Sequence, residues 1–313
     1  MNRFNNSFLD TQFNRPKYFI AVSVAVLSSS VFAGETQPWS GFYVGINSGV
    51  LKGTSTKVNT TTTNTYLYTD PSDPSDPPSN QASANLFSNP GASSSNPASY
   101  IGGGQIGYNW QPLDRFVVGL EADFQGIAGS GSATNYAGSA NPVDFVDGDG
   151  PDGYHIQSSQ NATNKMSTLG TARARIGFLA QPSLLLYGTG GLAYGQVKTS
   201  VQNNQSWIGF GGDGTDPNHQ DLGYDYDESG SGSQSRTQLG WTLGGGLEWM
   251  FVSNWSLKLE YLYYDLGTVS GSFETKYLGT GVNSAGWTGT QSVTNYNTRF
   301  SGNTVRAGIN YHF

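Results

Sequence analysis

The chain has 313 residues, a formal net charge of −7 and only 12% charged residues, whereas an average soluble domain has about 25%. It contains no cysteine, which excludes disulfides, thiolate metal sites and cysteine nucleophiles, and its acidic balance argues against nucleic acid as a partner. Its 43 glycines, 18 tyrosines and 16 phenylalanines favour an apolar or interfacial environment.

The N-terminal segment has the parts of a secretory signal peptide. Basic Arg15 and Lys17 precede an apolar run at 19–27, and small residues then lead to Ala33. Because a helix needs about 20 apolar residues to span a bilayer, we expect residues 1–33 to be removed rather than to anchor the chain. No other stretch reaches that length, so a membrane-embedded mature chain would have to cross as strands.

Eight later segments alternate apolar and polar side chains, as half-buried strands do. Their approximate bounds are 40–51, 100–110, 116–127, 167–179, 184–198, 236–250, 256–269 and 299–313. The short connections, which contain turn-forming Pro, Asn, Asp or Ser, are 111–115, 180–183 and 251–255. The long connections, rich in Ser, Thr, Asn, Gly and Asp, are about 52–99, 128–166, 199–235 and 270–298.

Short turns that alternate with long loops are typical of outer-membrane barrels, in which the turns are periplasmic and the loops extracellular. An even number of strands can also close into a cylinder that leaves no unpaired edge in lipid. We therefore predict an all-β fold over residues 34–313: an eight-stranded antiparallel up-and-down transmembrane β-barrel.

The charged residues of these strands share one face. In the last segment, Val305, Ala307 and Ile309 alternate with Arg306 and Gly308. An Arg or Lys facing lipid at mid-bilayer would cost about 2–4 kcal/mol, so the charged face is predicted to line the lumen. The predicted lumen charges are Glu121, Asp123, Arg173, Arg175, Glu248, Lys258, Glu260 and Arg306.

Four acids and four bases can neutralise one another, and eight strands enclose space only for side chains. We therefore expect a paired charge network that fills the lumen rather than lining an open channel. Inward glycines are expected to make room for the long basic side chains, namely Gly45, Gly103, Gly119, Gly244 and Gly246. The segment at 184–198 gives no clear face assignment.

Aromatic residues cluster at the short-turn end on the predicted lipid face. They are Trp110, Phe116, Phe178, Trp249, Trp255 and Phe313. Such a girdle is typical of membrane barrels, because aromatic side chains favour the membrane interface. The alternative, a soluble β-sandwich, would not require a signal peptide, alternating loop lengths and outward aromatics together.

Several segments resemble the porin-like outer-membrane immunogenic proteins of alphaproteobacteria. They are Trp39–Gly45, Gln105–Gln111, Leu185–Gly195, Asn254–Gly267 and Thr304–Phe313. The resemblance implies an eight-stranded barrel in the outer membrane, exported through a cleaved signal. The last strand also looks like the signal read by the barrel-assembly machinery, which implies that machinery as a folding partner. The residues that would carry this signal are Val305, Ala307, Ile309, Tyr311 and Phe313.

The loops hold residue types that could bind ligands. Asp144, Asp147, Asp149 and Asp152 invite a calcium interpretation, but Pro151 and the missing twelfth-position Glu depart from a calcium loop, so a solvated acidic loop is favoured. Asp213, Asp216, Asp221, Asp225, Asp227 and Glu228 are read in the same way.

Histidines are the other candidate ligands. Haem would need a loop ligand such as His155, with Tyr154, or His219, although a loop histidine is usually only solvated. His155 near Ser158 or Ser159 is weak support for a catalytic dyad, so no catalytic residue, metal or cofactor is assigned.

Our leading functional hypothesis is a non-enzymatic surface barrel whose loops meet an extracellular partner while the strands embed in the lipid bilayer. A small-solute channel is the first alternative, and it requires a wet path past the lumen charges. Haem capture by the loops is the second.

Overall fold

The computed structural model describes residues 39–53, 59–68, 79–81, 93–95, 98–129, 131–140, 143–147, 150–210, 226–277 and 287–313. All elements in these ranges are strands, and they form one 13-stranded sheet. No helix in the described part of the chain is long and apolar enough to cross a membrane. The predicted signal peptide lies outside the described residues.

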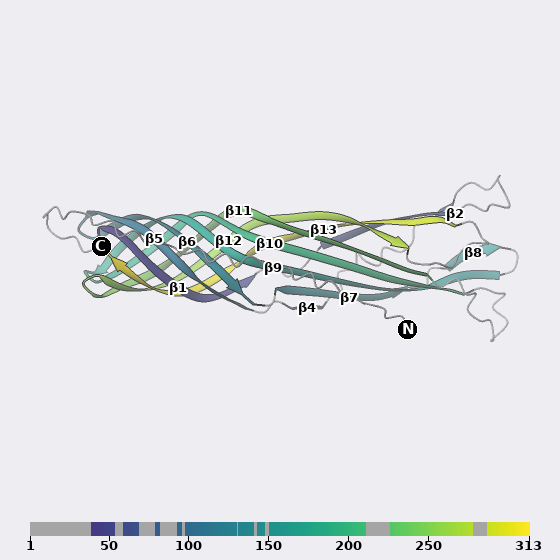
Figure 1. The fold of residues 1–313 in the computed structure, drawn as a ribbon, viewed down its shortest axis with the longest axis horizontal. Coiled ribbons are helices and arrows are strands. Elements are labelled where there is room, and N and C mark those ends of the chain that lie inside the picture. The colour runs from purple at the N-terminus through teal and green to yellow at the C-terminus, as the bar shows by residue number, and fades with distance from the viewer. Residues whose placement is uncertain are drawn as a thin grey trace, which may run out of the picture. The chain divides into compact units, whose positions relative to one another are not determined.

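Eight strands close into a ring (Figure 1). Their bounds are β1 Gly41–Gly53, β5 Ser99–Leu113, β6 Phe116–Ala128, β9 Gly150–Gln181, β10 Leu184–Phe210, β11 Tyr226–Val252, β12 Trp255–Tyr277 and β13 Trp287–His312. Neighbours pair antiparallel in chain order, and β13 pairs back with β1, for example through Ile46 and Ile309. The eight-stranded antiparallel barrel predicted from the sequence is confirmed.

The ring is staggered, as a closed barrel of tilted strands must be. A path of directly paired residues that begins at Lys52 on β1 crosses to Asn303 and continues through the other seven strands. It returns to β1 at Phe42, ten residues before its start. This stagger tilts the strands against the barrel axis, so residues at one membrane depth are offset from strand to strand.

Five shorter strands extend the sheet outside this ring. They are β2 Asn59–Tyr68, β3 Ser79–Gln81, β4 Ser93–Ser95, β7 Ser132–Ala140 and β8 Val143–Asp147. β2 pairs with β13, while β7 and β8 pair with β9. Pairing between β10 and β11 reaches Trp207 and Tyr226, and pairing between β12 and β13 reaches Lys276 and Gln291. Strand pairing therefore continues into all four of the segments that the sequence assigned to long loops.

The ring strands from β9 onward also run further than the alternation predicted. β9 begins at Gly150 instead of 167, and β13 begins at Trp287 instead of 299. The extra residues face inward with polar side chains such as Asn164, Thr199 and Asn203, all buried. The same inward face also holds a small apolar cluster, Ala162, Val201, Phe273 and Tyr296. Because polar and apolar residues are mixed on that face, no continuous apolar alternation marks the strands there, and the segments looked like loops.

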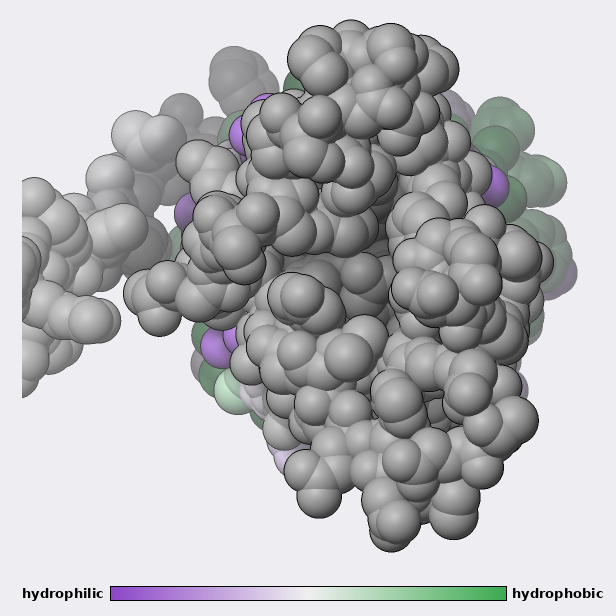
Figure 2. All heavy atoms as spheres, turned by 90° about the vertical axis from the view of Figure 1, so that its right-hand side faces the viewer, coloured by the Kyte–Doolittle hydropathy of each residue, from purple (hydrophilic) through white to green (hydrophobic). Residues whose placement is uncertain are grey.

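The outward face of the ring is apolar and exposed over its membrane-facing part. The six aromatics predicted at the short-turn end are between 40% and 59% exposed, and Phe116 and Phe178 pack edge to face on neighbouring strands. Tyr100, Tyr194 and Trp241 are the exposed aromatics near the other end of this band. Seen from the loop end, the described outer wall is hydrophobic with scattered hydrophilic residues (Figure 2).

Candidate functional site

The lumen of the membrane-facing part holds a buried charge layer. Its members come from β6, β9, β11, β12 and β13, and each is at most 5% exposed: Glu121, Asp123, Arg173, Arg175, Glu248, Lys258, Glu260 and Arg306. All eight charged residues that the sequence assigned to the lumen lie there. The apolar outer face fixes this placement, because the alternate side chain of a strand must then point inward.

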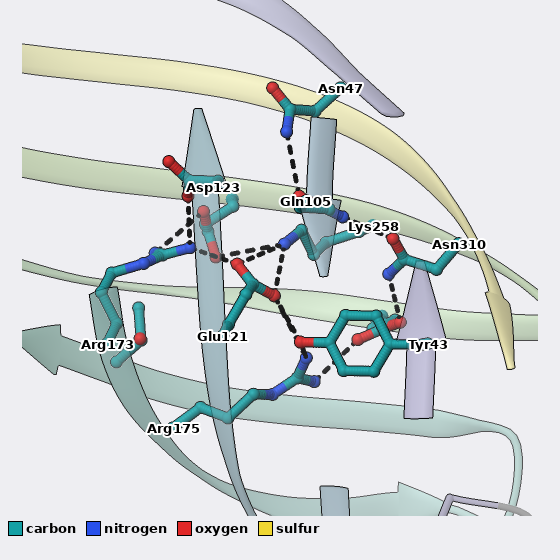
Figure 3. Close-up of polar contacts among 12 residues, drawn as sticks. Tyr43, Asn47, Gln105, Glu121, Asp123, Arg173, Arg175, Lys258 and Asn310 are labelled. Atoms are coloured by element: carbon teal, nitrogen blue, oxygen red, sulfur yellow. Dashed lines mark hydrogen bonds and ion pairs between the residues drawn. The ribbon is translucent and has the colours of Figure 1, made fainter. Parts of the chain in front are cut away.

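Glu121 on β6 is the hub of the charge layer (Figure 3). Lys258 Nζ lies 2.9 Å from each of its carboxylate oxygens, and Tyr43 donates its hydroxyl to Oε2 at 2.6 Å. Arg173 forms a further ion pair with Glu121 and reaches Asp123 at 3.1 Å. Four strands that are distant in sequence are therefore held together through one carboxylate.

A second group centres on Glu260 of β12. Arg306 donates Nε to Glu260 Oε2 at 2.7 Å and Nη2 to Asp123 Oδ2 at 2.7 Å. Tyr187 donates its hydroxyl to the other Glu260 oxygen at 2.8 Å. Arg173 joins this group to the Glu121 hub by lying 3.1 Å from Glu260.

Glu248 on β11 closes the charge layer toward the periplasmic turns. It accepts hydrogen bonds from Arg175 Nη2, Ser256 Oγ and Asn310 Nδ2 at 2.6–2.7 Å. His312 Nε2 lies 3.3 Å away, and its buried ring also fills the lumen. Each ionic group of the layer has at least one oppositely charged partner, as buried charges require, although Asp123 Oδ1, Arg173 Nε and Nη1 and Arg175 Nε form no hydrogen bond among the described residues.

Sequence reasoning missed two tyrosines of this layer. Tyr43 and Tyr187 are buried, and the Arg175 guanidinium lies 4.3 Å from the centroid of the Tyr187 ring. The strand alternation could have placed Tyr43 inward, opposite Phe42. Tyr187 lies on β10, whose face the sequence did not resolve because glycines interrupt its alternation.

The space beside the inward glycines is filled mainly by tyrosine, amide and backbone groups, and not by the basic side chains that the sequence predicted. A Cβ added at Gly246 would overlap the Tyr187 ring, and one at Gly45 would overlap the Asn310 amide. Gly119 lies against Asn109 and the Arg175 stem. Gly103 and Gly244 approach neighbouring backbone carbonyls. The expectation about these glycines was therefore right for Gly119 only, because tyrosine and amide side chains also share the lumen.

Apolar layers lie on both sides of the charge layer. The outer apolar layer consists of Leu51, Ile101, Leu169, Ala193, Val197, Tyr264, Leu266, Val269 and Phe300. The periplasmic apolar layer consists of Trp39, Val117, Leu179, Leu185 and Tyr187, with Met250 against it. Trp39 is fully buried and donates its indole N–H to the Pro182 carbonyl at 2.9 Å. Trp39, two residues before the start of β1, thus covers the periplasmic end of the lumen.

A polar column follows beyond the outer apolar layer. Its buried members are Gln160, Asn164, Thr199, Asn203, Thr275, Thr294 and Thr298. Gln160 donates to Asn203 at 2.9 Å, and Asn203 donates to Thr294 at 2.9 Å. Along β9 the buried inward residues other than glycine read Leu179, Arg175, Arg173, Thr171, Leu169, Asn164, Ala162 and Gln160 from the turn outward, which gives the order of the layers. Ala162 belongs to a small apolar cluster with Val201, Phe273 and Tyr296 that lies among the polar residues of the column.

The other candidate ligands from the sequence lie in β8, β9 or β11, or outside the described residues. Asp149 and His219 lie outside the described residues. Asp144 and Asp147 lie in β8, and Asp152, Tyr154 and His155 lie in β9, with His155 opposite Ile208. His155 is therefore a strand residue and not a loop residue. Among the described residues no group of His, Asp and Glu could hold a metal ion.

The predicted assembly-signal residues lie on the outward face of β13. Val305, Ile309 and Phe313 are 42–47% exposed, and Tyr311 packs against Trp255 with ring centroids 5.2 Å apart. This placement fits lipid contact. Recognition of the strand by the barrel-assembly machinery stays a prediction.

Comparison with known proteins gives matches over most of the chain. The model of the outer membrane protein beta-barrel domain matches residues 19–313. The 31 kDa outer-membrane immunogenic protein of Brucella melitensis is 33% identical over 285 residues, covering 89% of this chain and 85% of the relative. The 22 kDa outer membrane protein of Rhizobium leguminosarum is 31% identical over 184 residues, covering 56% of this chain and 60% of the relative.

Solved structures show weaker likeness. OprG from Pseudomonas aeruginosa matches with a TM-score of 0.30 and 9% identity, covering 88% of this chain and 97% of OprG. Ail of Yersinia pestis matches with a TM-score of 0.26 and 11% identity, covering 85% of this chain and 99% of Ail. The family match and the relatives suffice: the chain belongs to the outer membrane protein beta-barrel family, confirming the predicted resemblance, and is an outer-membrane protein.

Proposed function

We propose that this protein is a closed, non-enzymatic scaffold that presents its extracellular segments at the cell surface and does not conduct solutes. One observation carries the proposal: the charge layer is buried on all sides and lies between two apolar layers. An ion or solute would have to break paired charges and then cross a layer of packed aliphatic and aromatic side chains.

The relatives support the surface role. The Brucella melitensis relative is named an immunogenic outer-membrane protein, and an immunogenic protein of the outer membrane is one that presents surface to the outside. In this chain the segments available for that role are the connections at the loop end. Barrels of this kind commonly vary their loops on a constant wall, so we infer that any extracellular partner is met there.

Planar-bilayer recording of the refolded protein tests the closed lumen. We expect no steady conductance in most insertions, with insertion verified on the same sample by the heat-dependent shift of the folded barrel in gel electrophoresis. Steady conductance from verified insertions would overturn the proposal and favour the small-solute channel.

Haem capture stays a separate prediction from the sequence. Titration of haem into the same sample should leave the Soret band unshifted if the loops do not bind haem. A shift at micromolar haem that is lost in His155→Ala or His219→Ala would instead assign haem to these residues.

A further inference from the structure

Two lysines on neighbouring strands form a like-charge pair on the outer face of the barrel. Lys165 of β9 lies directly opposite Lys198 of β10 in the strand register. Both side chains are exposed, while the adjacent Asn164 and Thr199 are buried in the lumen. Directly opposed residues have Cβ atoms about 5 Å apart, and like charges in that position destabilise a sheet.

Among the described residues, the side chains that flank the pair in the strand register supply hydrogen-bonding groups and no acid. Thr163 and Ser167 flank Lys165 on its strand, and Gln196 and Ser200 flank Lys198. Ser235 lies opposite Lys198 on β11. The two ammonium groups therefore repel each other among hydroxyl and amide groups, and an anion between them would relieve that repulsion.

The pair also lies at a particular depth. On β10 the exposed aromatic Tyr194 precedes Lys198 by four residues. Four residues of strand span about 13 Å, which a tilt of about 40° reduces to about 10 Å of height. The lysines thus stand just beyond the hydrocarbon, at the level of lipid headgroups, and flexible lysine stems can reach down toward that level.

We propose that Lys165 and Lys198 together bind a phosphate group of a phosphorylated glycolipid in the outer leaflet. The negative charge of a phosphate would compensate the two positive ammonium groups. Its oxygens can also accept hydrogen bonds from both lysines and from the hydroxyls beside them. The binding site lies on the outer wall, so it is independent of whether the lumen conducts.

The test is the binding of diphosphorylated lipid A to the full mature barrel in detergent micelles, followed by native mass spectrometry. The Lys165→Gln/Lys198→Gln double variant should bind at least tenfold more weakly than the unaltered protein. Each single variant should lose most of that affinity, because both lysines contact one phosphate. Arg115→Gln, which removes an exposed charge at a periplasmic turn, is the matched control and should bind within twofold of the unaltered protein.

Three results would overturn the proposal. The first is a double variant that binds within twofold of the unaltered protein. The second is equal binding of dephosphorylated lipid A, which would assign the retention to acyl chains. The third is displacement of the lipid by submillimolar inorganic phosphate, which would assign the pair to a free anion instead of a membrane lipid.

A stability measurement guards against a trivial loss of folding. In lipid-free detergent the double variant should unfold at the same or a higher temperature, because the repulsion between the two lysines is removed. A clearly lower unfolding temperature would contradict the like-charge premise, since the lysines would then be stabilising the sheet themselves.

Discussion

The charge layer and the polar column fill the same barrel in opposite ways. In the charge layer, one carboxylate such as Glu121 contacts Tyr43, Arg173 and Lys258 at once. In the polar column, the hydroxyls of Thr199, Thr275 and Thr298 are buried with no hydrogen-bond partner in the described structure. Single atoms of the charge layer also lack a hydrogen bond within the described residues, namely Asp123 Oδ1, Arg173 Nε and Nη1 and Arg175 Nε, but each of those ionic groups keeps an oppositely charged partner through its other atoms. The three threonine hydroxyls have no such second contact in the part of the chain that the structure describes.

The outer face of the barrel differs between the charge layer and the polar column, and this explains why their pairing differs. The charge layer lies behind the apolar band that faces lipid, where an unpaired ion would have no water on either side. The column lies where the outer wall carries exposed polar and charged residues such as Thr163 and Lys198, and an unpaired hydroxyl costs far less than an unpaired ion. Loss of a partner should therefore be severe in one region and slight in the other.

Arg173→Ala should produce the largest effect. It would remove a partner of Glu121, Asp123 and Glu260 together and leave buried negative charge uncompensated. We expect the free energy of unfolding to fall by about 3–5 kcal/mol, measured by urea denaturation of the barrel in liposomes.

Arg115→Ala, in an exposed periplasmic turn, is the control for removing an arginine as such. It should leave the urea midpoint nearly unchanged. Equal midpoints for the two variants would show that the charge layer is hydrated and would remove the contrast with the polar column.

Leu266→Ala should come next. Leu266 is 1% exposed in the outer apolar layer, and truncating a buried leucine leaves a cavity that costs about 2–4 kcal/mol. The variant should still be silent in planar bilayers, because the charge layer beneath it remains paired. Conductance in Leu266→Ala would show that the outer apolar layer alone seals the lumen.

Much of the barrel could be predicted from the sequence, because side chains that face lipid must be apolar. A charged residue such as Arg306, between Val305 and Ala307, can point only into the lumen of a membrane barrel, because pointing into lipid would cost too much free energy. The alternation therefore predicted the barrel strands and the ionic residues inside them. No lipid hydrocarbon surrounds the strands at Asn164 and Thr199, so polar side chains are tolerated on both faces there. The sequence pattern therefore does not show which face points into the lumen. The strand extensions and the polar column were therefore missed.

The partners within the lumen were also beyond the sequence. Hydrogen bonds such as the one from Tyr43 to Glu121 cross the barrel, and they depend on the stagger between strands. Alternation shows which face a residue takes but not its height relative to another strand. Tyr187 shows the same limit, because the glycines of β10 hide even its face.

Thr199→Val tests the tolerant region. The Thr199 hydroxyl has no hydrogen-bond partner in the described structure, so an apolar group of the same shape should change the free energy of unfolding by less than about 1 kcal/mol, in either direction. Urea denaturation alongside Arg173→Ala gives the comparison directly. A loss as large as that of Arg173→Ala would mean that the column hydroxyl is bonded and that both regions obey the same rule.

Asp265→Asn should have the smallest effect and the clearest pH dependence. On β12 the outward aromatics end at Tyr263, so Asp265 lies just outside the membrane-spanning segment. Hydrogen bonds from Arg299, including one from Nε at 3.2 Å, lower the pKa of the Asp265 carboxyl, and the backbone N–H of Gly267 adds to this at 2.9 Å. Gly267 can place that N–H because its φ of 77° favours glycine.

A carboxyl whose pKa is lowered in the folded state stabilises the fold above its ordinary pKa of about 3.9, and that contribution is lost as the pH falls through the folded pKa. The unfolding temperature of Asp265→Asn should therefore lie slightly below that of the unaltered protein at pH 7, and the two should converge as the pH falls through the lowered pKa of the folded state. Asp114→Asn, in an exposed turn, is the control for removing an aspartate as such and should leave the unfolding temperature at pH 7 nearly unchanged. A gap for Asp265→Asn that stays constant with pH would mean that the ion pair with Arg299 does not stabilise the outer rim, and that tight pairing is confined to the charge layer.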